Sequence, residues 1–156
     1  MMSEPNEKSA TAAQLVRTHM FGAVAAAILP VPLLDIAVLG GVQLRMLRKL
    51  AALYEVEFSE QRAKTIIGAL VGVGITGGAA GVLKMLLPGT AKIAFGVGAL
   101  TIPPASTYAL GRVFIQHFES GGTIWTFDPS RAKQDYDREV GAGQKVVAKQ
   151  YSGIKP

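Results

Sequence analysis

Gly72, Gly74 and Gly77 stand at the spacing that dinucleotide-binding proteins use to bring the backbone close to a pyrophosphate. That chemistry also needs a strand before the first glycine and an acidic residue about 20 positions further on. Here the surrounding residues form a continuous apolar run, and no Asp or Glu occurs between Glu60 and Glu119. The pattern therefore does not indicate a nucleotide site, and we expect no cofactor.

The other residue types that could carry out catalysis are few and scattered. His19 and His117 are the only histidines, neither belongs to a set with metal-ligand spacing, and the chain has no cysteine. Ser106 and Thr107 lack the glycines of a nucleophile elbow, and hydroxyls in apolar helices commonly bond to backbone carbonyls. We therefore expect a protein that binds no metal and is not an enzyme.

Two stretches without any formal charge are the most informative feature of the chain. They cover residues 65–83 and 93–111, and each is 19 residues long. As a helix, such a stretch spans roughly 28 Å, close to the thickness of the hydrocarbon core of a membrane. The short connection between them, residues 84–92, contains a Pro-Gly pair that favours a turn. The pattern predicts an apolar, Gly-rich hairpin of two membrane-crossing helices.

Small residues recur at a spacing of four along the first of these stretches. Such a spacing lets another backbone approach closely, which supplies packing inside a membrane. The residues concerned are Gly68 and Gly72, Gly74 and Gly78, and Gly77 and Gly81. We interpret this glycine face as the packing surface within the hairpin, and homo-oligomerisation through the same face is the alternative.

The remaining elements complete an all-α fold with four main helices. The pattern predicts the first from about Ser9 or Thr11 to position 29, the second over 32–56, the third from a Ser59 cap to position 84, and the fourth over 90–119. A short polar helix should follow an Asp128 cap and end at Gly141 to Gly143. The sequence thus divides into a disordered N-terminus (1–10), a helical membrane domain (11–122) and a polar, basic C-terminal tail (123–156).

Charged residues near the apolar segments suggest two kinds of contact. Asp35 is the only charged residue over 18–44, and it is satisfied either by the dipole of its helix or by an ion pair with Arg112 or Arg45. Arg45, Arg48 and Lys49 lie off the apolar seam of the second helix, with no base-stacking aromatic residues among them. We expect these three to contact lipid headgroups or a protein partner, and not nucleic acid.

The distribution of basic residues predicts an orientation. The chain carries 16 Lys and Arg against 11 Asp and Glu, a net charge of +5, and its first residues are polar and acidic, unlike a signal peptide. Two lysines flank the tip of the predicted hairpin, whereas six basic residues lie at or beyond its other end: Arg45, Arg48, Lys49, Arg62, Lys64 and Arg112. Because excess Lys and Arg mark the cytoplasmic side, both termini should be cytoplasmic.

Several short segments, in order and spacing, resemble a known bacterial family. They are Leu-Pro-Val-Pro-Leu-Leu-Asp at 29–35, Gln-Leu-Arg-Met at 43–46, Leu-Tyr at 53–54, Ser-Thr-Tyr-Ala-Leu-Gly-Arg at 106–112 and Phe-Glu at 118–119. Over about residues 18–122 they resemble the domain of unknown function 697. The resemblance implies a helical module of the bacterial inner membrane, often joined to an Era-like GTPase domain. Glu55 replaces a glycine that is frequent in the family.

Together these features predict a non-enzymatic integral membrane anchor or scaffold. Its partners would be membrane lipid and a cytoplasmic protein. The resemblance implies that this cytoplasmic partner is a GTPase. One alternative is a homo-oligomeric pore or membrane-remodelling element that uses the glycine face. Another is a soluble helical bundle with an unusually dry core.

Overall fold

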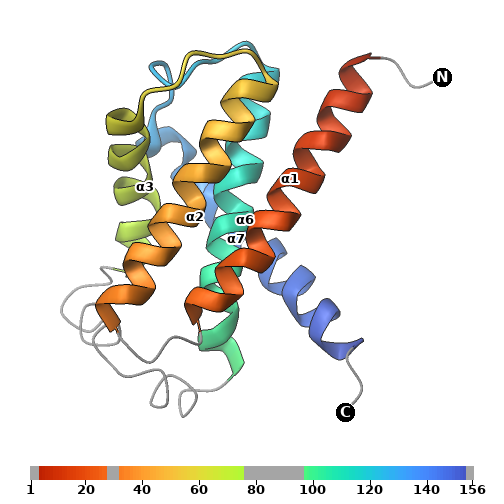
Figure 1. Ribbon diagram of the computed structural model, residues 1–156, viewed down its shortest axis with the longest axis vertical. Coiled ribbons are helices and arrows are strands. Elements are labelled where there is room, and N and C mark those ends of the chain that lie inside the picture. Colours follow the sequence, from red (N-terminus) through yellow and green to blue (C-terminus); the bar gives the residue numbers. More distant parts are fainter. Residues whose placement is uncertain (1–3, 28–31, 76–96, 154–156) are drawn as a thin grey trace.

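The chain folds into helices in every range that the structure describes. A computed structural model describes residues 4–27, 32–75 and 97–153, and these ranges contain no strand. Their helices are α1 (Glu4–Ala27), α2 (Pro32–Leu53), α3 (Glu60–Ile75), α6 (Val97–Glu119) and α7 (Pro129–Ser152) (Figure 1). The predicted all-α class is therefore confirmed.

Side-chain caps fix the starts of α3 and α7 where the sequence predicts them. The Ser59 hydroxyl accepts a hydrogen bond from the backbone amide of Arg62 at 3.3 Å. The Asp128 carboxylate accepts one from the amide of Ser130 at 2.9 Å. Because the first amides of a helix have no partner within it, each cap supplies a missing acceptor.

Two helices end in the same hydrogen-bonded motif with a left-handed residue. After α2, the amides of Glu55 and Val56 reach back to the Ala52 and Ala51 carbonyls at 3.2 and 2.8 Å. Glu55 has φ +58°, and at the end of α6 Gly121 has φ +86°. Glycine adopts this conformation without steric cost, whereas a residue with a Cβ atom does not. The turn after Tyr54 thus keeps the geometry that suits glycine, although this chain has Glu55 there.

The helices run in alternating directions along the long axis of the molecule. Figure 1 shows that the C-terminal ends of α1 and α3 and the N-terminal ends of α2 and α6 point to the same end, which is the lower one in that view. The turn between α2 and α3 and the connection between α6 and α7 lie at the opposite end. Consequently α2 and α6 are parallel to each other.

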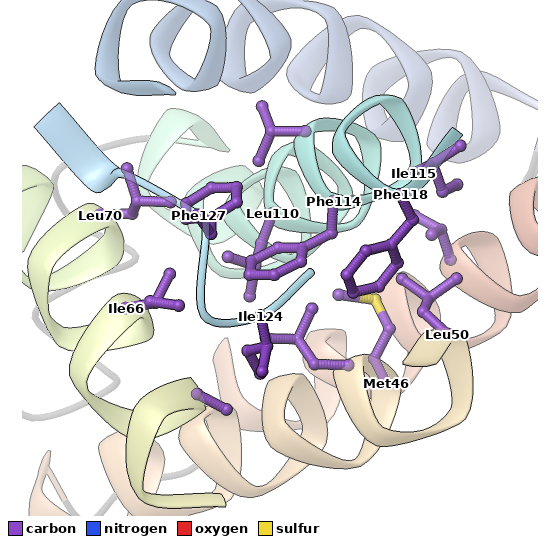
Figure 2. Packing of buried hydrophobic residues seen from close by; sticks show 14 of the residues in the cluster. Met46, Leu50, Ile66, Leu70, Leu110, Phe114, Ile115, Phe118, Ile124 and Phe127 are labelled. Atoms are coloured by element: carbon purple, nitrogen blue, oxygen red, sulfur yellow. The ribbon is translucent and has the colours of Figure 1, made fainter. Parts of the chain in front are cut away.

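The core lies between α1, α2, α3 and α6, with Tyr136 of α7 joining it, and is closed by the connection that follows α6. The rings of Phe114 and Phe127 stack with centroids 4.2 Å apart, and Phe118 meets Phe114 edge-on at 5.5 Å. Figure 2 shows these rings among the aliphatic side chains Met46, Leu50, Ile66, Leu70, Leu110 and Ile124. The connection over 120–128 therefore contributes Ile124 and Phe127 to the core.

The structure corrects the predicted ends of two helices. α1 begins at Glu4, so residues 4–10 are helical and not disordered. α7 does not end at Gly141 to Gly143 but continues to Ser152, and it packs along α6 with Tyr136 and Val147 buried. Burial of one face outweighs the low helix propensity of two glycines, which explains why the local stop signal failed.

The described parts of the predicted membrane hairpin belong to α3 and α6, which contact each other. Among the described residues, none of the helices has the combination of length and apolar character that crossing a bilayer requires. The predicted tip at 84–92 and the residues on both sides of it fall within 76–96, outside the described ranges. Two membrane-crossing helices are thus not found in the part of the chain that the structure describes.

Candidate functional site

Charge is segregated along α1, α2, α3 and α6. The end at which α1 and α3 terminate, here called the apolar end, comprises residues 18–27, 32–44, 65–75 and 97–111, and within these ranges the sole charged residue is Asp35. The C-terminal half of α7, which carries Lys145 and Lys149, runs toward the same end. The opposite end, here called the charged end, contains the start of α1, the turn between α2 and α3, and the connection after α6. Such a division gives the two ends different affinities for water and lipid.

Large apolar side chains are exposed at the apolar end. Phe21 on α1 is 43% exposed and Ile102 on α6 is 49% exposed. The third large apolar residue that is exposed among those described, Trp125, is 55% exposed and lies in the connection at the charged end. Exposed apolar surface of this kind marks contact sites for lipid or for other proteins.

A buried polar layer joins α2 to α6 inside the apolar end. The Gln43 side chain is fully buried, and its Nε2 atom donates to Ser106 Oγ and Thr107 Oγ1, each at 3.2 Å. The two hydroxyls donate in turn to the Pro103 carbonyl at 2.8 and 3.0 Å. Ser106 and Thr107 therefore bond to a backbone carbonyl as expected. Gln43 Oε1 is buried and has no hydrogen-bond partner among the described residues.

Both histidines bond to backbone carbonyls. A ring nitrogen of His19 lies 2.8 Å from the Leu15 carbonyl oxygen, and Nε2 of His117 lies 2.8 Å from that of Thr123. No group of three or more potential metal ligands occurs within 4–27, 32–75 and 97–153. In the described part of the chain the histidines thus contribute to packing and to local hydrogen bonding.

Only part of the predicted glycine face lies within the described residues. Gly68 lies on α3, and a Cβ atom there would meet no described atom within 4 Å, so none of the described helices approaches α3 closely at that point. Gly72 and Gly74 belong to α3, but their surroundings are not described. The other members, Gly77, Gly78 and Gly81, lie outside the described residues.

Close helix contacts occur instead at two glycines that the sequence reasoning missed. A Cβ atom on Gly111 would lie 2.4 Å from Val16 Cγ2, and one on Gly143 would lie 3.0 Å from the Cα atom of Ala105. These glycines bring α6 against α1 and α7 against α6. Thr107 and Gly111 are small residues four apart, which is the signal that would have indicated the first contact.

Among the described residues, the ion-pair partner of Arg112 lies on α7. The Arg112 Nε atom lies 3.9 Å from Glu139 Oε2 on that helix. The side chain of Asp35 is outside what the structure describes. However, α2 and α6 are parallel and Gln43 meets Thr107, which spaces positions 35 and 112 by roughly 20 Å along the axis at about 1.5 Å per residue. This register does not favour the predicted ion pair.

The basic residues of α2 are exposed in its second half. Arg48 donates to Glu60 at 2.8 Å, and its guanidinium lies 5.4 Å from the centre of the Phe58 ring. It thereby ties α2 to the start of α3. Arg45 and Lys49 form no ion pair with any described residue, so both keep a free charge for the contact that the sequence predicts.

At the charged end, Tyr54 and Glu119 link the ends of α2 and α6. The Tyr54 hydroxyl donates to Glu119 Oε1 at 2.8 Å. Burial, reinforced by this hydrogen bond to a carboxylate, raises the pKa of Tyr54 well above its ordinary value. Burial likewise raises the pKa of Tyr136, which lies on α7. Both tyrosines are neutral, structural groups at physiological pH.

Comparison with known proteins places this arrangement in context. The family described as Domain of unknown function (DUF697) matches residues 3–137, which reach from α1 into α7. The chain is also 37% identical over 143 residues to Magnetosome membrane protein 22 of Magnetospirillum gryphiswaldense. That match covers 88% of this chain and 73% of the relative. No solved structure matches the chain.

Proposed function

This chain belongs to the family of the domain of unknown function 697. We propose that it is a membrane-associated helical scaffold and not an enzyme. The name of its relative, a magnetosome membrane protein, supports association with a membrane. The segregation of charge along the bundle carries the proposal, since it gives the molecule one end suited to lipid and one suited to water.

In this proposal the apolar end enters the cytoplasmic leaflet of the bacterial inner membrane. Phe21 and Ile102 are exposed there, where burial in lipid would remove apolar surface from water. Entry into one leaflet leaves both termini on the cytoplasmic side, in agreement with the orientation that the basic residues predict. If the predicted hairpin, which includes 76–96, crosses the bilayer, the same end of the protein would be inserted through both leaflets.

The charged end faces the cytoplasm and holds a protein partner. Trp125 is 55% exposed there, and tryptophan is among the residues that contribute most to protein interfaces. Arg45 and Lys49, which form no ion pair within the described ranges, add positive charge on α2. The family resemblance makes a separate GTPase the partner to test first.

A matched pair of substitutions tests the membrane part of the proposal. Ile102→Glu and Trp125→Glu each place a carboxylate at an exposed apolar position, so neither should disturb folding. In flotation with lipid vesicles, Ile102→Glu should weaken binding, because the charge would have to leave water, whereas Trp125→Glu should float like the unaltered chain. Equal flotation of both variants would show that the apolar end does not bind lipid.

Photo-crosslinking in cells tests the partner part. A photoreactive phenylalanine analogue replaces Trp125 in one variant and Ile102 in another. The probe at position 125 should yield an adduct with a protein, to be identified by mass spectrometry, and the probe at position 102 should yield adducts with lipid. Absence of a protein adduct specific to position 125 would remove Trp125 from the partner interface.

A further inference from the structure

We propose that the C-terminal half of α7 binds the headgroups of anionic phospholipids through Lys145 and Lys149. The inference rests on the membrane association proposed above and adds to it the class of lipid. It depends on three observations: the pairing of charges along α7, the place where α7 crosses α6, and the direction in which the two lysines point.

Charges in the N-terminal half of α7 neutralise one another. Each basic residue there is paired with an acidic residue of the same segment: Arg131 with Asp128, Lys133 with Asp137, and Arg138 with Asp135. Glu139 lies 3.9 Å from Arg112. After position 139 the helix contains no acidic residue. The positive charge of α7 is thus concentrated in its C-terminal half.

Lys145 and Lys149 are the basic residues of this C-terminal half. Both are exposed, and neither forms an ion pair with any residue in the described ranges. A lysine ammonium on a flexible stem is a strongly hydrated point charge that can move to meet a phosphate. Two such groups on neighbouring turns form a small cationic surface.

The crossing at Gly143 places this surface beside the apolar end. Gly143 lies against the backbone of Ala105, and Ala105 belongs to the part of α6 that carries no charge. From there α7 continues toward the end to which the C-terminus of α1 also points (Figure 1). Lys145 and Lys149 follow the crossing by about 3 and 9 Å along the helix axis.

Helical periodicity directs the two lysines away from the bundle. Gly143 and Val147 are four residues apart and buried, which makes them the inward face of α7. Lys145 and Lys149 share the same spacing but lie on the opposite side. Insertion of the apolar end only as far as Ala105 would bring this side of α7 close to the headgroup phosphates.

The combination of exposed apolar residues and free lysines at one end is typical of proteins that bind the membrane surface. Each lysine close to an anionic bilayer strengthens binding about fivefold at ordinary ionic strength. Two lysines should therefore favour anionic over neutral vesicles by about thirtyfold. The preference should decline as salt screens the charges.

The test compares two double variants that remove the same charge from α7. One is Lys145→Gln with Lys149→Gln, and the control is Arg131→Gln with Arg138→Gln. The control positions are exposed on the same helix but paired with aspartates. Flotation is measured with phosphatidylcholine vesicles and with vesicles that also contain phosphatidylglycerol, at low and high salt. Circular dichroism checks that all variants are equally helical.

The full-length unaltered chain should prefer the vesicles with phosphatidylglycerol, and the lysine variant should lose most of that preference while the arginine variant keeps it. If the chain binds both kinds of vesicle equally, or if the lysine variant keeps the preference, the lipid-headgroup role is overturned and membrane association stands. If the unaltered chain binds no vesicle at all, both proposals fail.

Discussion

Gly143 of α7 lies so close to Ala105 of α6 that a Cβ atom at position 143 would be 3.0 Å from both the Cα atom and the carbonyl oxygen of Ala105. Real Cβ atoms rarely approach backbone atoms at this distance, and the backbone of a packed helix moves little. The contact therefore fixes where α7 crosses α6. Gly141, two residues earlier on the same helix, has nothing within 4 Å of its would-be Cβ atom.

The two glycines of α7 should respond to alanine in opposite directions. Gly143→Ala should lower the free energy of unfolding by about 1–3 kcal/mol, because the methyl group forces the helices apart. Gly141→Ala should raise it by about 0.5–1 kcal/mol, because alanine has the higher helix propensity and meets no neighbour. Urea unfolding followed by circular dichroism measures both. The same change in both variants would mean that α7 does not cross at Gly143.

The contact between Gly111 and Val16 should appear as an energetic coupling. Gly111→Ala should destabilise the protein by about 1–3 kcal/mol, since the new methyl group would overlap the two γ-methyl groups of Val16. Val16→Ala removes both of those methyl groups. In the double variant the loss should be smaller than the sum of the single losses by about 0.5–3 kcal/mol.

A double-mutant cycle by thermal or urea unfolding gives this coupling directly. Gly68→Ala is a suitable control, because a Cβ atom at that position would meet no described atom within 4 Å. It should be neutral or stabilising. Strict additivity of Gly111→Ala and Val16→Ala would rule out the close approach of α1 and α6.

Glu55→Gly should stabilise the protein by about 1 kcal/mol. Glu55 has φ +58° at the end of α2, where glycine avoids the steric cost of a Cβ atom. The exposed ion pair of Glu55 with Lys8, at 3.8 Å, contributes little in water. Glu55→Ala keeps the Cβ atom and should bring no comparable gain. If alanine and glycine stabilise equally, loss of charge and not backbone conformation is the cause.

Stability should fall on the alkaline side. The folded state raises the pKa of Tyr54 and Tyr136, so each favours folding fully below about pH 10, the pKa of an unfolded tyrosine, and loses that contribution as the pH rises beyond it. Unfolding midpoints at pH 8 and pH 11 would show the loss. Tyr136→Phe cannot ionise, so its midpoint should fall less between these two values than that of the unaltered chain.

Local signals predicted the starts of α2, α3 and α7 and the end of α6. Ser59, Asp128 and Pro32 mark helix starts where the structure has them, because capping depends on hydrogen bonds and backbone angles within a few residues. Gly121, with its positive φ angle, stops α6 just after Glu119, and this signal too lies within a few residues of the helix end. Signals of this range need no knowledge of the rest of the molecule.

Tertiary packing decided what the sequence reasoning missed. Gly143 looks like a helix stop in isolation, but α7 continues because its inward face is buried against α6. The lengths of the uncharged stretches predict membrane crossings. Their described parts, 65–75 and 97–111, lie at one end of the bundle because of the directions of the helices, which a single sequence does not reveal.

The packing of α1 on α6 also has a consequence for biosynthesis. Val16 and Gly111, which meet in the folded protein, are about 95 residues apart in the chain. A ribosome adds about 5–20 residues per second, so α1 leaves the exit tunnel about 5–20 seconds before its main partner is complete. Throughout that interval the face that carries Val16, Met20 and Ala23 lacks α6 to cover it. The nascent chain thus offers its apolar helix to a chaperone or to the bilayer before the bundle can close.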